Sequence, residues 1–218
     1  MDSEKISEYI ESLYEGKNDL ARREFIEKTA WKDFVPAVEE DAARFLRVLL
    51  AVKRPKEILE IGTGIGYSAA NMALAARAYG GRITTVESDE TAAEQAHRNF
   101  VRAGVDGMVR ILRGDALKIL PSLPDESFDL VFQDADKRLY AKLLPDCIRV
   151  LKPGGVFLAD DALFPVMDLD PKWNGLVQPM AGFDRQVAGS SALCSTLLPI
   201  GDGVIFAVKN NTKEDFGT

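Results

Sequence analysis

The sequence predicts an α/β protein with a parallel, doubly wound sheet and an antiparallel hairpin at its C-terminal edge. Short apolar segments alternate with helix-like segments from residue 57 onward, which is typical of a parallel sheet with helices on both faces. Near the end of the chain, Gly201-Asp202-Gly203 separates two apolar runs with no helix between them, as in a hairpin. With 218 residues, 46% of them apolar and 28% charged, the chain suits one globular domain with a buried core.

The elements follow in order along the chain. Charged and apolar residues alternate at helical spacing over residues 2–30, and Glu39–Ala51 is a second amphipathic stretch, so helices precede the sheet. Strands are expected at Glu57–Ile61, Arg82–Glu87, Val109–Arg113, Phe128–Gln133 and Val156–Ala159, and the hairpin at Leu193–Ile200 and Val204–Lys209. Helices are expected at Tyr67–Tyr79, Glu90–Gly104, Ala116–Leu120, Leu139–Leu151 and Phe183–Ser190. Lys152-Pro153-Gly154-Gly155 should stop a helix, and Leu163–Gly182 should be rich in loops.

Charge and composition exclude several classes of protein. The net charge of −7 disfavours binding to a nucleic-acid backbone or an anionic membrane surface. The longest uncharged runs are rich in Gly, Ser and Thr, so no membrane span is expected, and the charged N-terminus does not resemble a signal peptide. We therefore expect a cytoplasmic protein, in which Cys147 and Cys194 stay reduced.

The chain has a single histidine, His97, in a helix-like segment. A zinc site with several histidines is therefore excluded. A general base would be Lys, Asp, Glu or Tyr, and a metal would be held by oxygen, which favours Mg²⁺, Mn²⁺ or Ca²⁺.

Acidic residues stand at the ends of all five parallel strands. Ligands of open parallel sheets bind outside the carboxyl ends of the strands. Each acid alone could be a helix N-cap, but several on one rim predict a binding site. These acids are Glu60, Glu87, Asp115, Asp134, Asp136, Asp160 and Asp161.

The first strand runs into a glycine loop, Gly62-Thr63-Gly64-Ile65-Gly66. Tyr67 falls where a dinucleotide fingerprint needs another glycine, and the carboxylate of Glu60 would be a poor neighbour for a pyrophosphate. It suits a cationic group instead. Glu87 ends the second strand, where an acid can bind a ribose diol. An adenosine ligand with a cationic tail is S-adenosylmethionine.

Asp134, Asp160 and Asp161 follow two strands that should be neighbours. Their converging charges would repel and raise one another's pKa, and a divalent cation would relieve this. Lys137 follows Asp134 by one helical turn, and nearby cations would lower its pKa so that it can act as a base. Two other interpretations stay open: a salt-bridge cluster of these acids with Lys137 and Arg138, and an exposed lysine at a helix start.

These motifs resemble those of the cation-dependent O-methyltransferases, which include catechol and caffeoyl-CoA O-methyltransferases. The resemblance covers about residues 34–209, and it implies a Rossmann-like, doubly wound, mostly parallel seven-stranded sheet with an antiparallel C-terminal hairpin and N-terminal helices. It implies one methyltransferase domain over residues 1–218, with an N-terminal helical extension (1–52) and a Rossmann-like core (53–209), and a homodimer. The segments that carry it are Glu60–Ser68, Glu87, Gly114–Ala116, Asp134–Lys137, Asp160–Asp161 and Leu198–Gly203.

The resemblance also implies a role for each matching position. S-adenosylmethionine would be held by Val38, Glu60, Gly62, Thr63, Ser68, Glu87, Asp115, Ala116 and Asp134, with Glu87 at the ribose and Asp115 and Ala116 at the adenine. The divalent cation, Mg²⁺ first and Mn²⁺ or Ca²⁺ as alternatives, would be held by Asp134, Asp160 and Asp161. Lys137 would be the general base towards the acceptor hydroxyl.

Two positions depart from the family pattern. Asp161 stands where the family usually has Asn, and its extra charge should tighten cation binding. Phe164 stands where a tryptophan often lines the acceptor pocket, and the loop with Met167, Trp173 and Met180 is particular to this chain. Both departures concern the acceptor and not the cofactor.

The function expected from these residues is divalent-metal-dependent O-methylation of a catechol-like or other vicinal-dihydroxy aromatic small molecule. One alternative is tRNA 5-hydroxyuridine, for which Arg22, Arg23, Lys28 and Lys32 would be the basic cluster. Another is a nicotinamide dehydrogenase, which Glu60 and the incomplete glycine fingerprint oppose. A third is a non-catalytic protein that binds an adenosyl ligand.

Overall fold

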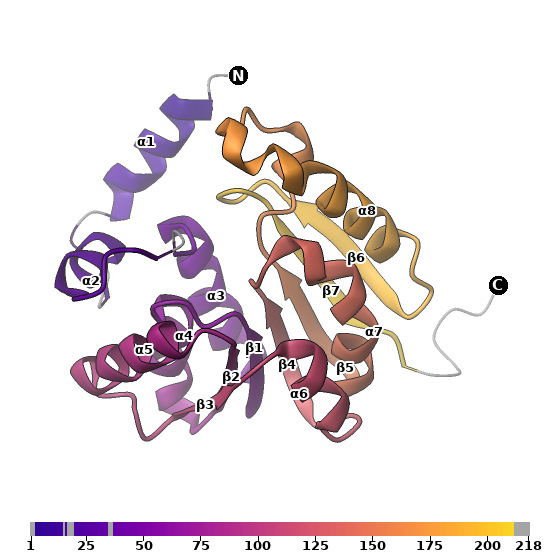
Figure 1. Cartoon of the computed structure of the whole chain (residues 1–218), viewed down its shortest axis with the longest axis horizontal. Helices are drawn as coiled ribbons and strands as arrows, with labels where there is room; N and C mark the ends of the chain where they lie inside the picture. The colour runs from indigo at the N-terminus through magenta and orange to yellow at the C-terminus, as the bar shows by residue number, and fades with distance from the viewer. Residues whose placement is uncertain (1–2, 15, 17–19, 35–36, 212–218) are drawn as a thin grey trace.

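The computed structural model describes residues 3–14, 16, 20–34 and 37–211. In this part of the chain, seven strands form one sheet in the order β3-β2-β1-β4-β5-β7-β6 (Figure 1). The strands are β1 Glu57–Ile61, β2 Arg82–Glu87, β3 Val109–Arg113, β4 Phe128–Gln133, β5 Leu151–Ala159, β6 Leu193–Leu198 and β7 Val204–Lys209. The first five are parallel, and β7 runs antiparallel to both β5 and β6. The predicted fold class is therefore confirmed.

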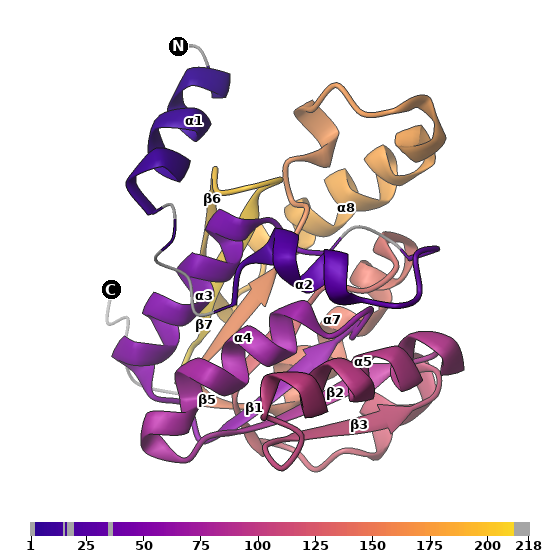
Figure 2. The ribbon, with the colours of Figure 1, turned by 90° about the vertical axis from the view of Figure 1, so that its left-hand side faces the viewer.

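Helices cover both faces of the sheet (Figures 1 and 2). They are α1 Ser3–Tyr14, α2 Arg22–Lys28, α3 Glu40–Lys53, α4 Tyr67–Ala76, α5 Glu90–Ala103, α6 Ala116–Ile119, α7 Tyr140–Val150 and α8 Val177–Ala188. Short 3₁₀ turns are η1 Arg77–Tyr79, η2 Leu120–Ser122, η3 Lys137–Leu139, η4 Phe164–Val166 and η5 Pro171–Leu176. No helix among the described residues is long and apolar enough to cross a membrane.

The strands divide their apolar residues between two cores, because successive side chains of a strand point to opposite faces of the sheet. In β4, Leu130 and Phe132 pack into the core under α3, α4 and α5. Val131, between them, packs into the core under α7 and α8. The bounds of β1, β2, β3, β4 and β7 are as predicted. Burial on both faces of the sheet accounts for the apolar residues of β1 and β4.

Two elements start five or more residues before the predicted residue, and the other boundaries differ by smaller amounts. Lys152-Pro153-Gly154-Gly155 lies inside β5 and does not precede it, since Leu151 already pairs with Phe128 and a register shift follows. Helix α8 begins at Val177, six residues before the predicted start. Its buried Met180 adds a contact one turn before Phe183, so core packing extends the helix through a stretch that reads as a loop.

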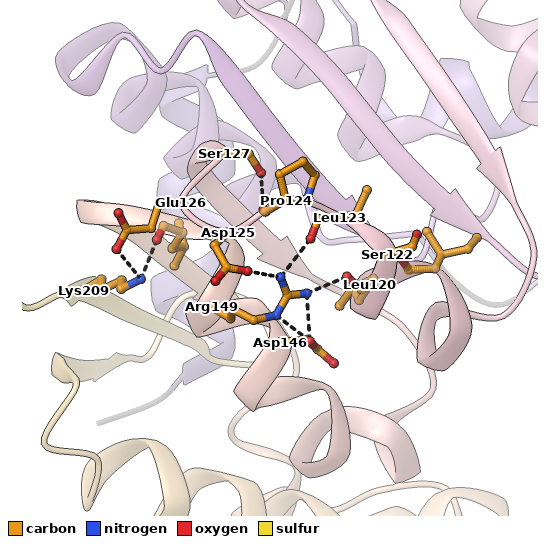
Figure 3. A network of polar contacts seen from close by, with 12 residues as sticks. Leu120, Ser122, Leu123, Pro124, Asp125, Glu126, Ser127, Asp146, Arg149 and Lys209 are labelled. Atoms are coloured by element: carbon orange, nitrogen blue, oxygen red, sulfur yellow. Dashed lines mark hydrogen bonds and ion pairs between the residues drawn. The ribbon is translucent and has the colours of Figure 1, made fainter.

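Arg149, near the end of α7, ties this helix to the segment that leads into β4 (Figure 3). Its guanidinium donates to the carbonyls of Leu120 (2.7 Å) and Leu123 (2.8 Å). It also pairs with Asp146 at 2.9 Å and Asp125 at 2.5 Å. One side chain thereby satisfies two loop carbonyls and fixes how α7 lies against the sheet.

Candidate active site

A cavity of about 840 Å³ opens at the carboxyl ends of the parallel strands. The segments after β1, β2, β3, β4 and β5 all contribute to its lining, as expected at this edge of a parallel sheet. Every predicted site residue except Glu60 lies on that lining: Val38, Gly62, Thr63, Ser68, Glu87, Asp115, Ala116, Asp134, Lys137, Asp160 and Asp161. The fold therefore brings the predicted residues to one cavity.

The glycine loop is held by close backbone contacts. Gly62 has φ +95°, and a Cβ there would lie 2.0 Å from the carbonyl oxygen of Asp134, so only glycine lets the ends of β1 and β4 approach. Glu87 accepts hydrogen bonds from the amides of Thr63 (3.1 Å) and Gly64 (2.9 Å). Its other carboxylate oxygen accepts from the amide of Asp89 (2.9 Å). Glu87 thus fixes the loop and also borders the cavity.

Glu60 lies behind the cavity wall and is fully buried. The hydroxyls of Ser68 and Thr85 each donate to one of its carboxylate oxygens at 2.5 Å. Burial raises the pKa of Glu60 to about 8, against these two hydrogen bonds, and the charges of Asp134 and Glu87 add to the rise. Ser68, and not Glu60, reaches the cavity, so Glu60 would act on a ligand through this hydroxyl.

Asp115 and Ala116 lie where β3 passes into α6. The Asp115 carboxylate accepts from the amide of Leu117 at 2.9 Å, so this acid caps the helix as well as lining the cavity. Ala116 is buried beside it. The N-cap interpretation of Asp115 is therefore confirmed, and its place on the lining is compatible with a second role in binding.

Lys137 forms the centre of the acidic cluster. Its Nζ lies 2.7 Å from Asp134, 2.5 Å from Asp161 and 3.0 Å from the hydroxyl of Tyr140. An ammonium has three N–H groups, and these three oxygens can take all of them. Burial alone would lower the pKa of Lys137, but Asp134, Tyr140 and Asp161 outweigh it and leave that pKa well above its ordinary value. Lys137 is therefore protonated in this arrangement.

The carboxylates around Lys137 repel one another in a buried place. Asp160 is 4% exposed, and its Oδ1 has no hydrogen-bond partner. Burial, followed by the charges of Asp134 and Asp161, raises the pKa of Asp160 well above its ordinary value. Burial also raises the pKa of Asp161 to about 6, although Lys137 opposes the rise. Asp161 has φ +61°, a left-handed conformation that Asn and Asp tolerate better than most residues.

No three His, Cys, Asp or Glu side chains in the described part of the chain are arranged to hold a metal ion together. In the predicted metal set, the ammonium of Lys137 bridges Asp134 and Asp161 instead. This is close to the salt-bridge cluster considered from the sequence, although Arg138 pairs with Asp136 and stays outside it. The carboxylate donors and the unpartnered Oδ1 of Asp160 fit a hard cation in their chemistry. Such a cation would have to displace Lys137 from these oxygens.

Other residues of the site were not foreseen from the sequence. Tyr140 lies one turn after Lys137, and its hydroxyl donates to the carbonyl of Gln133 (3.1 Å) while it accepts from Lys137. The helical spacing of Lys137 and Tyr140 is a signal that could have found this contact. Asp202, in the hairpin turn, also borders the cavity, and only the tertiary fold brings it there.

The cavity also has an apolar wall, which includes Phe164, Leu169, Trp173 and Leu176. Phe164, a position at which the resemblance leads us to expect tryptophan, lines the cavity, and Trp173 from η5 lines it as well. Met167 and Met180 are absent from the lining: Met167 is exposed, and Met180 is buried in the core. Of the three loop residues particular to this chain, Trp173 is the one that could contact an acceptor.

The chain is similar to known proteins in both sequence and fold. The sequence model of the O-methyltransferase family matches residues 12–210. A catechol O-methyltransferase of Niastella koreensis is 33% identical over 203 residues, which are 89% of this chain and 90% of that protein. The crystal structure of an O-methyltransferase from Bacillus cereus in complex with SAH has a TM-score of 0.80 at 26% identity, covering 94% of this chain and 97% of that one. The O-methyltransferase TomG from Streptomyces achromogenes, in complex with SAM, has a TM-score of 0.78 at 28% identity, covering 97% and 100%.

Proposed function

The chain belongs to the O-methyltransferase family, and on that premise we propose that it transfers a methyl group from S-adenosylmethionine to a catechol-like or other vicinal-dihydroxy aromatic small molecule. One observation carries the proposal: a single cavity joins the glycine loop and Glu87 to the Lys137 cluster and an apolar wall. The relatives whose structures hold SAH and SAM support the choice of cofactor.

The glycine-loop half of the cavity would bind the cofactor. We assign the methionine end to Gly62, Thr63 and Ser68, since this hydroxyl and these backbone groups border the cavity. Glu87 would bind the ribose hydroxyls with the lone pairs that the loop amides leave free. Asp115 and Ala116 would border the adenine, and the buried Val38 would close over the ligand.

The Lys137 half would activate the acceptor. Bound S-adenosylmethionine supplies a methyl group on a positively charged sulfur, which leaves as a neutral thioether when the acceptor oxygen attacks the methyl carbon. Lys137 would take the proton of the acceptor hydroxyl. Because Lys137 starts as an ammonium, it must first give up one proton to solvent and break one of its ion pairs with a carboxylate. A nearby positive charge favours that loss, because like charges lower the pKa of an ammonium. The rim would hold oxygen and methyl in line, which can supply much of the rate.

We also propose a divalent cation, Mg²⁺ or alternatively Mn²⁺ or Ca²⁺, held by Asp134, Asp160 and Asp161. Their oxygen donors and the unpartnered Oδ1 of Asp160 support this. When bound, such an ion would act as a Lewis acid towards the acceptor oxygens.

The charges of the site favour a small molecule over tRNA. The cavity lining contains two basic residues, Lys137 and Arg138, and both pair with acids of the same lining. The basic cluster considered for tRNA is also engaged within the fold: Arg22 with Glu39, Arg23 with Glu27, Lys28 with Glu24, and Lys32 with the carbonyls of Ile26 and Glu27. Family membership places the chain among methyltransferases and not among dehydrogenases.

The proposal also covers the domain organisation, the cellular environment and the oligomeric state. Residues 53–209 would form the Rossmann-like catalytic core, with residues 1–52 as an N-terminal extension. The unpaired Cys147 and Cys194 support a reducing, cytoplasmic environment. The family resemblance supports a homodimer, which size-exclusion chromatography with light scattering would test.

The decisive experiment is an acceptor screen with labelled S-adenosylmethionine, using simple catechols and hypomodified tRNA, with Mg²⁺ and with excess chelator. We expect methylation of catechols that chelator abolishes while calorimetric cofactor binding persists. Full activity in chelator would disprove metal dependence, and methylation of tRNA alone would replace the proposed acceptor.

A further inference from the structure

Arg22, the first residue of α2, is bonded to the segment that precedes α3. Its Nη2 donates to the carbonyl of Ala37 at 2.8 Å, and its Nε donates to the carbonyl of Val38 at 3.0 Å. Nη2 also pairs with Glu39 at 3.0 Å. The guanidinium therefore binds three consecutive residues of one extended segment, Ala37 and Val38 through their backbone carbonyls and Glu39 through its side chain.

The neighbouring Arg23 shows how a surface arginine of the same helix behaves. Its side chain is 90% exposed and pairs with Glu27, one turn along α2. The side chain of Arg22 is 23% exposed and reaches across to a segment fifteen or more residues away. Exposed pairs such as Arg23–Glu27 contribute little to stability, whereas hydrogen bonds from a half-buried guanidinium to backbone carbonyls fix a geometry.

The segment that Arg22 binds, residues 37–39, forms one wall of the cavity. Ala37, Val38 and Glu39 all line it, and these residues belong to no helix or strand. The Glu39 carbonyl accepts the first helical bond of α3 from the amide of Ala43 (2.9 Å), whereas no helix or strand hydrogen bond of the described residues holds the carbonyls of Ala37 and Val38. The bonds from Arg22 to two of these carbonyls set where this wall stands.

The same segment is tied to the glycine-loop side of the cavity. Glu40, which follows it, accepts from the amide of Arg22 and from the hydroxyl of Tyr67, both at 2.8 Å. Tyr67 is the first residue of α4, directly after the glycine loop, and its ring packs edge-on against Phe25 of α2 at 5.3 Å. The wall that Arg22 holds is therefore continuous with the proposed cofactor half of the cavity.

We infer that Arg22 is a positioning residue for S-adenosylmethionine, which it serves by fixing the backbone of Ala37, Val38 and Glu39 as the wall over the cofactor. This inference rests on the proposed function of the cavity. Arg22 does not line the cavity, so it acts through the segment it holds. The cost of losing it should fall on cofactor binding and not on the chemical step.

The test compares Arg22→Ala and Arg22→Lys with Arg23→Ala, which removes the same charge from the next position. Calorimetry with S-adenosylhomocysteine, the KM for S-adenosylmethionine, the KM for a catechol and kcat are measured for each. For Arg22→Ala we expect the Kd and the cofactor KM to rise about tenfold or more. Its kcat at saturating cofactor should stay within about twofold of wild type, since uniform binding was lost and not transition-state binding. Arg23→Ala should behave as wild type.

Arg22→Lys should recover only part of the affinity, because an ammonium cannot reproduce the fork that reaches two carbonyls. If Arg22→Ala fails to fold, Arg22→Lys replaces it in the test. The rise in melting temperature that S-adenosylhomocysteine causes is then compared between Arg22→Lys and Arg23→Ala. Unchanged cofactor affinity in both Arg22 variants, or a loss confined to kcat, would overturn the inference. A wild-type protein that binds neither cofactor form would instead overturn the proposed function.

Discussion

At the scale of single residues, the neighbours of each charged side chain determine how that side chain is paired in the site. Lys137 pairs with Asp134 and with Asp161, a position at which the family resemblance leads us to expect Asn. A neutral amide could not neutralise the ammonium in the same way. From the sequence, the charge of Asp161 was expected to strengthen the binding of a divalent metal ion. In this geometry Asp161 pairs with the ammonium of Lys137 instead.

Replacing Lys137 with Met should separate an enzyme from a binding protein. The thioether side chain keeps the apolar stem and removes the amine, so cofactor affinity should change little while turnover falls roughly 10²–10⁴-fold, the usual contribution of a general base. The pH–rate profile should also lose its rise on the basic side. Lys142→Met, an exposed position on α7, is the matched control. Wild-type turnover of a catechol by Lys137→Met would refute the catalytic role.

Glu60 should make the stability of the cofactor-free protein depend on pH. Its folded pKa is raised from the ordinary 4.5 to about 8, so the folded state binds the proton more tightly than the unfolded state does. The stabilisation is complete below about pH 4.5 and is lost as the pH rises through 8. A tenfold difference in proton affinity between the two states is worth about 1.4 kcal/mol, so a loss of a few kcal/mol is expected across this window.

Urea unfolding of Glu60→Gln, which cannot ionise, measures this effect. The variant should lack most of the decline between pH 5 and pH 9, and it should be more stable than wild type at the upper end. Glu57→Gln, at the exposed start of the same strand, controls for the loss of one carboxylate. If wild type and Glu60→Gln decline in parallel, the raised pKa is wrong.

At the scale of secondary-structure elements, apolar periodicity predicted the strands well. The bounds of β1 to β4 agree with the prediction: β1 and β4 are buried on both faces of the sheet, whereas β3, at its edge, is only partly buried. The starts of β5 and α8 do not agree with it, because they depend on partners elsewhere: Phe128 pairs with Leu151, and the core under α8 receives Met180. At the starts of β5 and α8, strand pairing and core packing outweighed the local preference of turn-forming residues.

Arg149 is the contact by which α7 is fixed to the segment before β4 (Figure 3). Replacing it with Ala should lower the free energy of unfolding by about 2–3 kcal/mol, because two loop carbonyls and two acids lose a charged donor. Arg98→Ala is the control, since the pair that Arg98 forms with Glu94 lies along its own helix and its side chain is 64% exposed. Denaturant unfolding measures both, and equal stability of the two variants would contradict the assignment.

At the scale of the whole molecule, the acidic character of the chain concentrates in the cavity. Ten acidic and two basic side chains border it, and both basic ones are already paired. The acids come from every part of the chain: Asp33, Glu39, Glu87, Asp89, Asp115, Asp134, Asp136, Asp160, Asp161 and Asp202. This field should repel acceptors that carry an anionic group.

Catechols with matched side chains test this effect. At low salt, kcat/KM for a 4-alkylcatechol should exceed that for the analogue ending in a carboxylate by at least several-fold, and added salt should reduce the difference by screening. Asp202→Asn should also reduce it, because Asp202 borders the cavity. Asp168→Asn, an exposed position outside the lining, should not. Equal rates for both acceptors at low salt would show that the field does not select the acceptor.

The amino-acid sequence was enough to establish the fold class, the strand-end acids and the glycine loop, because local periodicity and strand order place these residues on one rim. It also carried the family, since the motifs at Glu60–Ser68 and Asp134–Lys137 are contiguous. The folded structure was needed to show that Glu60 lies behind Ser68, that Lys137 pairs with two carboxylates, and that Arg22 donates to the carbonyl of Ala37. Burial and the pairing of distant charges depend on how the whole chain packs, and no local pattern of residues specifies them.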